Sequence, residues 1–291
     1  MTDGTVYAAG WTLDDIPWSR FDRAKVEPGM VDAVKAASLV EYNAPAYVAY
    51  LHGVFAGGDP QTLDDITRWG REEAQHGIAL GRWAELADPG WSFADAFARF
   101  HAGYRPPHFA SDATASIRGS RRGEMIARCV VESGTSSYYS AIRDTVDEPV
   151  LKEIAAHIAA DEFRHYRFFF DTMHAQTEPD LPFWRKLIVA LGRVNESEDD
   201  ELAFAYYCAT VGADEAAEKP YIREHYARAT LRRTGLIYSR QHVRKLVQMV
   251  AKAVGASPQS RMTEAAAVLA WRVMRLRAGL SVSARSAPVT A

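Results

Sequence analysis

Two short segments of the sequence place a glutamate three positions before a histidine. They are Glu73-Ala74-Gln75-His76 and Glu162-Phe163-Arg164-His165. On an α-helix, residues three apart share a face and lie about 4.5 Å apart along the axis, so both side chains could bind one metal ion. One such pair arises readily by chance in a chain with 9 histidines. Whether a pair indicates a metal site therefore depends on the residues that precede it.

Each pair is preceded by a glutamate in an otherwise apolar setting. Glu41 lies 32 residues before Glu73, and Glu132 lies 30 residues before Glu162. This spacing matches half a helix, a turn and half of a second helix, so antiparallel neighbours would bring each glutamate level with its pair. Four converging carboxylates repel one another unless cations lie between them. With the two imidazoles they form the ligand set of di-iron carboxylate bundles, which predicts two iron ions, with manganese as the alternative.

The periodicity of apolar residues predicts helices from Val31 almost to Leu280, and strand patterns are nearly absent. Long helices are expected over residues 29–55, 61–87, 117–145 and 149–175. Pro45 should kink the first of them. Two helix pairs joined by a long connection with one short helix, over 88–116, predict an all-α, ferritin-like four-helix bundle with one long crossover. Additional C-terminal helices are expected near 183–212, 216–254 and 260–279.

The expected organisation has four parts along the chain. They are an irregular lead-in over 1–28, a di-metal four-helix bundle over 29–175, additional helices packed on the bundle over 176–280, and a disordered tail over 281–291. Trp11, Trp18 and Phe21 are the expected anchors of the lead-in.

Composition limits the classes of partner. The chain has 291 residues, 48% of them hydrophobic and 24% charged, and a net charge of -3, which gives no indication of nucleic acid or an anionic membrane surface as partner. No apolar run approaches the roughly 20 residues that span a bilayer, and no signal peptide precedes the helices. Cys129 and Cys208 lie in apolar helical segments, where free buried thiols suit a reducing cytoplasm.

Two segments resemble a known family. Residues 72–77, Glu-Glu-Ala-Gln-His-Gly, are similar to the first metal-binding motif of the soluble acyl-carrier-protein desaturases, and residues 160–165, Ala-Asp-Glu-Phe-Arg-His, are similar to the second. Glu41 stands four residues before Pro45, as the family's first-helix ligand does before its proline. The resemblance covers roughly residues 25–175 and is more specific for the di-iron site than for the substrate. Ribonucleotide reductase small subunits, aromatic N-oxygenases, bacterioferritins and rubrerythrins carry related motifs.

Three further residues have expected roles beside the metals. Thr135 lies three residues after Glu132, where the desaturases carry a threonine, and the resemblance implies that it handles protons or oxygen chemistry. Glu72 and Asp161 each precede a ligand glutamate, and we expect them to hydrogen-bond the ring nitrogen of a metal-bound histidine that faces away from the metal. Exposed acids are the alternative for both. Tyr138, Tyr139 and the run 168–170 are expected in the core, with the lining of an apolar channel as the alternative.

These features predict an oxygen-activating di-iron oxidoreductase, either a desaturase or a hydroxylase or oxygenase. Its substrate would be apolar or partly apolar, either a small molecule or bound to a carrier protein. The alternative is a ferritin- or bacterioferritin-like protein for iron storage or protection from oxidation, which uses the same six ligands. The more than 100 residues after the second motif, and Thr135, count against storage. A structural metal is the third reading.

An enzyme of this type needs electrons from outside. Full reduction of dioxygen takes four electrons, and a two-electron oxidation of a substrate supplies only half of them. Two cysteines cannot form a four-cysteine iron–sulfur site, and no G-x-G-x-x-G motif is present. A separate ferredoxin-like or flavin-dependent reductase is therefore expected. A homodimer is compatible with the sequence.

Overall fold

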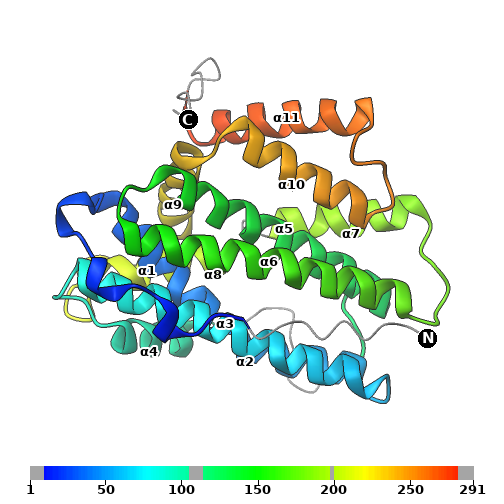
Figure 1. Ribbon diagram of the computed structural model, residues 1–291, viewed down its shortest axis with the longest axis horizontal. Coiled ribbons are helices and arrows are strands. Elements are labelled where there is room, and N and C mark those ends of the chain that lie inside the picture. The colour runs from blue at the N-terminus through cyan, green and yellow to red at the C-terminus, as the bar shows by residue number, and fades with distance from the viewer. Residues whose placement is uncertain (1–9, 105–113, 197–199, 281–291) are drawn as a thin grey trace.

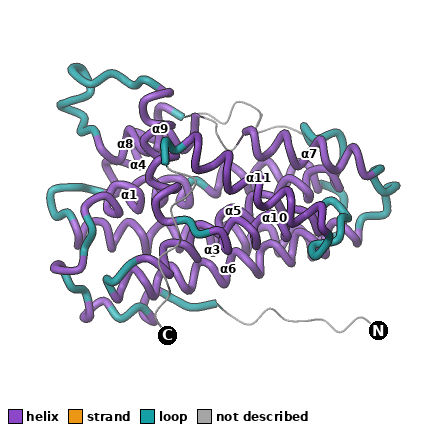
Figure 2. The backbone as a smooth tube through the Cα atoms, turned by 90° about the horizontal axis from the view of Figure 1, so that it is seen from above, coloured by secondary structure: helices purple, strands orange, loops and turns teal. Residues whose placement is uncertain are grey.

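The structure, a computed structural model, describes residues 10–104, 114–196 and 200–280. Within these ranges the regular secondary structure is all helix, joined by loops and turns, and there is no strand, as the periodicity predicted (Figure 2). No helix of the described part is long and apolar enough to cross a membrane. The first nine residues of the expected lead-in, and the expected tail over 281–291, lie outside the described residues.

Eleven α-helices follow one another in the described part of the chain. They are α1 (Pro28–Tyr42), α2 (Ala44–Phe55), α3 (Pro60–Ala87), α4 (Phe93–Gly103), α5 (Arg121–Thr145), α6 (Pro149–Ala175), α7 (Phe183–Glu196), α8 (Asp200–Thr210), α9 (Arg223–Ile237), α10 (Arg240–Ala253) and α11 (Arg261–Arg277).

Four predicted helices, over 61–87, 117–145, 149–175 and 260–279, correspond to α3, α5, α6 and α11. Three other predicted helices are each divided in two. The first divides at Asn43, because Pro45 has no N–H to continue the ladder of backbone hydrogen bonds. The helix predicted over 216–254 divides before Ser239, whose hydroxyl accepts from the backbone N–H of His242 and starts α10. The helix predicted over 183–212 becomes α7 and α8, on either side of residues that the structure does not describe.

The three longest helices run side by side along the length of the molecule (Figure 1). Helix α1 pairs with α3, α5 pairs with α6, and α3 contacts α6. Helices α4 and α8 cover α1, whereas α7 and α10 pack on α5, and α11 packs on α10. The C-terminal helices therefore cover α5 on its outer side.

Local signals fix where the long helices begin. Asp59, Ser120 and Glu148 each accept backbone N–H bonds in the first turn of α3, α5 and α6, respectively. Gly77 allows α1 and α3 to approach closely, because a Cβ there would lie 2.7 Å from the backbone nitrogen of Tyr42. Two apolar clusters result, one at each end of the bundle, and the polar layer between them holds the residues considered next.

The described part of the lead-in forms three short 3-10 turns that lie across the bundle. Trp11, Trp18 and Phe21 pack against the apolar cluster at this end, as expected of anchors. The buried carboxylate of Glu148 accepts from the backbone N–H of Asp22 at 3.1 Å and from the Trp83 indole at 2.7 Å. It thereby ties the lead-in to α3 and to the start of α6.

Candidate metal centre

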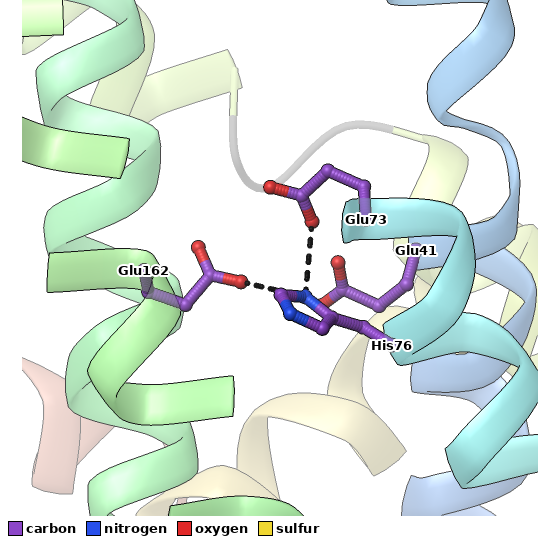
Figure 3. A group of neighbouring side chains, drawn as sticks. All are labelled: Glu41, Glu73, His76 and Glu162. Carbon is purple, nitrogen blue, oxygen red and sulfur yellow. Dashed lines mark ion pairs between the residues drawn. The ribbon is translucent and has the colours of Figure 1, made fainter. Parts of the chain in front are cut away.

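The six predicted ligands converge in the middle of the bundle. Glu41 comes from α1, Glu132 from α5, and each of the two Glu-x-x-His pairs from α3 or α6. The ligands form two groups, within each of which the candidate atoms lie within 4.8 Å of one another. The first group is Glu41, Glu73, His76 and Glu162, and the second is Glu73, Glu132, Glu162 and His165. Figure 3 shows the side chains of the first group pointing toward one another.

Glu73 and Glu162 belong to both groups. Nδ1 of His76 lies 3.4 Å from Glu73 Oε2 and 3.3 Å from Glu162 Oε1, and Nδ1 of His165 lies 3.0 Å from Glu73 Oε1. Two atoms that bind the same ion at about 2.1 Å lie at most roughly 4.2 Å apart, so these positions need little movement to share an ion. Two ions held here could both contact Glu73 and Glu162, whereas the other four ligands each belong to one group.

Both histidines turn Nδ1 toward the centre and Nε2 away from it. Nε2 of His76 lies 3.0 Å from Asp161 Oδ2, and Nε2 of His165 lies 2.7 Å from Glu72 Oε2. Each acid therefore holds the histidine of the other motif, across the α3–α6 interface. Such outer hydrogen bonds fix the ring orientation and the tautomer of a metal-binding histidine.

Arg164 and Trp11 complete this outer layer. Arg164 pairs with the Oδ1 atom of Asp161 and lies 3.5 Å from Glu72 Oε2. The indole N–H of Trp11 donates to Asp161 Oδ2 at 2.8 Å, and its ring stacks on His76 with a centroid distance of 6.0 Å. Only the role of an anchor could be predicted for Trp11, because no spacing relates it to His76, 65 positions later.

The polar atoms at the centre lack partners within the described part of the chain. These atoms are Nδ1 of His76 and of His165, both carboxylate oxygens of Glu132, and Oε1 of Glu162. Buried polar groups are nearly always hydrogen-bonded, and each unmet one costs about 1–3 kcal/mol. Metal ions would satisfy all five atoms at once, so the donor set fits two cations.

The carboxyl pKa values divide into two kinds. Burial raises the pKa of Glu41 and of Glu132 well above the usual range, and the neighbouring carboxylates raise it further. Burial acts in the same direction on Glu73, but the adjacent imidazoles of His165 and His76 outweigh it and hold the pKa of Glu73 well below the usual range. Without metal, Glu41 and Glu132 therefore keep their protons to higher pH than a free carboxyl does, which reduces the repulsion.

The histidine pKa values complete this charge balance. Burial alone lowers the pKa of an imidazole, but the carboxylates around His76 and His165 outweigh it and raise the pKa of both rings well above the usual range. In the metal-free protein both rings therefore keep a proton to higher pH than a free imidazole does. A metal ion that binds at Nδ1 must displace such a proton.

Two hydroxyl groups touch the ligand carboxylates. The Thr135 hydroxyl donates to Glu162 Oε2 at 2.6 Å, and the Tyr139 hydroxyl donates to Glu41 Oε1. Thr135 is partly exposed, whereas Tyr139 is buried as expected of a core residue. Its bond to Glu41 was not predicted, because the sequence relates the two residues by no spacing.

A small cavity of about 20 Å³ reaches His165 from the surface between α3 and α6. Its lining includes Trp69, Glu72, Arg164 and Phe168. This volume holds about one water molecule. The ligands are thus buried between the two apolar clusters, and a narrow opening lies beside His165.

Comparison with known proteins adds no relative. A scan of the sequence against models of protein families finds no match, and a search of the curated proteins finds none.

Proposed function

We propose that this chain is a ferritin-like di-iron protein, an oxidoreductase of the desaturase, hydroxylase or oxygenase type. The observation that carries the proposal is the pair of overlapping ligand groups with Glu73 and Glu162 in common. Mixed oxygen and nitrogen ligands favour iron, with manganese next. Iron in such a site supplies one-electron redox chemistry and reactivity with dioxygen.

The chain's own residues would position and protect that chemistry. Asp161 and Glu72 hold the two imidazoles in the orientation that leaves Nδ1 free. The Thr135 hydroxyl orients Glu162 by donating a hydrogen bond to its Oε2 atom. The same hydroxyl could pass a proton to that carboxylate. The apolar clusters on both sides keep bulk water away. An apolar or partly apolar substrate remains the proposed class.

The experiment that tests the proposal is anaerobic reduction of the iron-loaded protein followed by readmission of oxygen. Optical and Mössbauer spectra should report close to two irons per chain, spin-coupled, and a rapid reaction with oxygen. Iron that stays unreactive would indicate a structural metal. Growth of a ferric mineral well beyond two irons per chain would support the storage alternative instead.

We also propose a separate electron donor, a ferredoxin-like or flavin-dependent reductase. Cys129 and Cys208 are both buried, free and far apart in the chain, so they supply no redox centre of their own. Turnover should require the donor protein, and sustained turnover with NAD(P)H alone would show an internal path for electrons.

A further inference from the structure

A second feature of the molecule is a groove of about 800 Å³ between α5, α6 and α10. Ligand-binding clefts commonly enclose about 300–1,000 Å³. None of the six metal ligands lines it.

Helices α6 and α10 run in the same direction along this groove (Figure 1). The Tyr166 hydroxyl donates to the Met249 carbonyl at 2.9 Å, and Nζ of Lys252 lies 4.6 Å from the centre of the Phe170 ring. Both contacts join residues about 82 positions apart. By the same offset, Phe163 on α6 lies level with Lys245 on α10. From Phe163 to position 171 the groove is about 12 Å long.

A strip of apolar side chains runs along the groove among polar ones. Phe163 is 50% exposed, and the partly buried side chains of Phe170, Leu246 and Met249 continue the apolar strip. A half-exposed phenylalanine beside further apolar side chains is the kind of surface that marks a binding site.

Positive charge borders this strip. Arg167, Lys245 and Lys252 line the groove, against a single acid, Asp171. None of these four residues forms an ion pair within the described part of the chain. Lys252 and Asp171 lie at the same end, so their charges offset each other there. The uncompensated positive charge is that of Arg167 and Lys245.

We propose that the groove binds an amphipathic anion, a small molecule with an apolar body and one acidic group. The body would lie along Phe163, Leu246 and Phe170. The acidic group would lie between Arg167 and Lys245, near the hydroxyl of Ser140, which also lines the groove. The inference is independent of the proposed di-iron function, because it uses other residues.

Two dyes of the same shape test it. They are 8-anilinonaphthalene-1-sulfonate and N-phenyl-1-naphthylamine, which lacks the sulfonate. Fluorescence titration of the full chain should show that Arg167→Gln and Lys245→Gln each weaken binding of the sulfonate about threefold to fivefold, the range of an exposed ion pair. The double variant should weaken it at least tenfold, and binding of the neutral dye should not change. Added salt should weaken only the sulfonate.

The control is Lys152→Gln, which removes an exposed lysine near the other end of α6 and should leave both dyes unchanged. Leu246→Glu, which places a negative charge on the apolar strip, should reduce binding of both dyes. Unchanged binding of the sulfonate in the double variant overturns the proposal, since the dye would then lie on another surface. Equal losses for the two dyes would also overturn it, because charge would then play no part.

Discussion

Replacing Glu132 by methionine should impair metal binding and at the same time stabilise the metal-free protein. Glu132 is 1% exposed, and neither of its carboxylate oxygens has a hydrogen-bond partner in the described structure. Nδ1 of His165 lies 3.7 Å from Glu132 Oε2 and only 3.0 Å from Glu73 Oε1, so it is closer to Glu73. Methionine has a similar length and shape, and a thioether is a poor ligand for iron at a site of this kind.

The expected magnitude follows from the unmet oxygens. A buried polar atom without a partner costs about 1–3 kcal/mol, and its removal stabilises the fold by that amount. The lost attraction to His165 offsets part of this stabilisation. We therefore expect the free energy of unfolding of the metal-free protein to rise by about 1–2 kcal/mol. For a chain of this size that corresponds to a rise in melting temperature of about 2–6 °C.

Glu148→Met is the matched control, because it makes the same chemical change at an equally buried position, also 1% exposed. Its carboxylate accepts from Asp22, Trp83 and Leu151, and loss of these bonds should destabilise the protein by about 3 kcal/mol or more. Urea unfolding in EDTA and metal analysis measure both effects. A Glu132→Met variant that keeps two metals, or that is destabilised as much as Glu148→Met, would refute the reasoning.

Three further predictions concern the same centre. Metal affinity should rise with pH in competition titrations, because burial raises the pKa of Glu132 and the surrounding carboxylates raise the pKa of His165, so protons must leave before metal binds. An affinity independent of pH would contradict this. Thr135→Val should retain both metals but slow the reaction with oxygen in stopped-flow measurements, whereas Thr135→Ser should restore it. Asp161→Asn and Glu72→Gln should each lower metal affinity by about 10- to 100-fold without loss of helix content in circular dichroism.

The helical fold and the convergence of the ligands could be predicted from the sequence, because both follow from local spacing. Glu73 and His76 share a helix face at any position in any bundle, and the interval from Glu41 to Glu73 needs only one turn between two antiparallel helices. Metal content and the bundle family stay predictions, since neither the spacing nor the convergence of ligands identifies an ion.

The outer layer could not be predicted in detail. Spacing shows that Glu72 and Asp161 stand beside ligands, but the choice of histidine depends on how α3 and α6 rotate against each other. The contact of Trp11 with Asp161 depends on the path of an irregular segment. The groove depends on where α10 packs. The apolar periodicity predicts one longer helix there, because it does not reveal that Ser239 caps the start of α10.

The break between α1 and α2 makes one corner of the centre easier to open than the rest. The Glu41 carbonyl has no donor four residues later, because that residue is Pro45, and it accepts instead from the N–H of Asn43. Glu41 therefore sits near a helix end, and its side chain also accepts from Tyr139. Local unfolding starts where backbone bonds are fewest, so we expect the amides after Asn43 to exchange hydrogen before those around His165. An ion held through Glu41 would then exchange with solvent sooner than one held through His165.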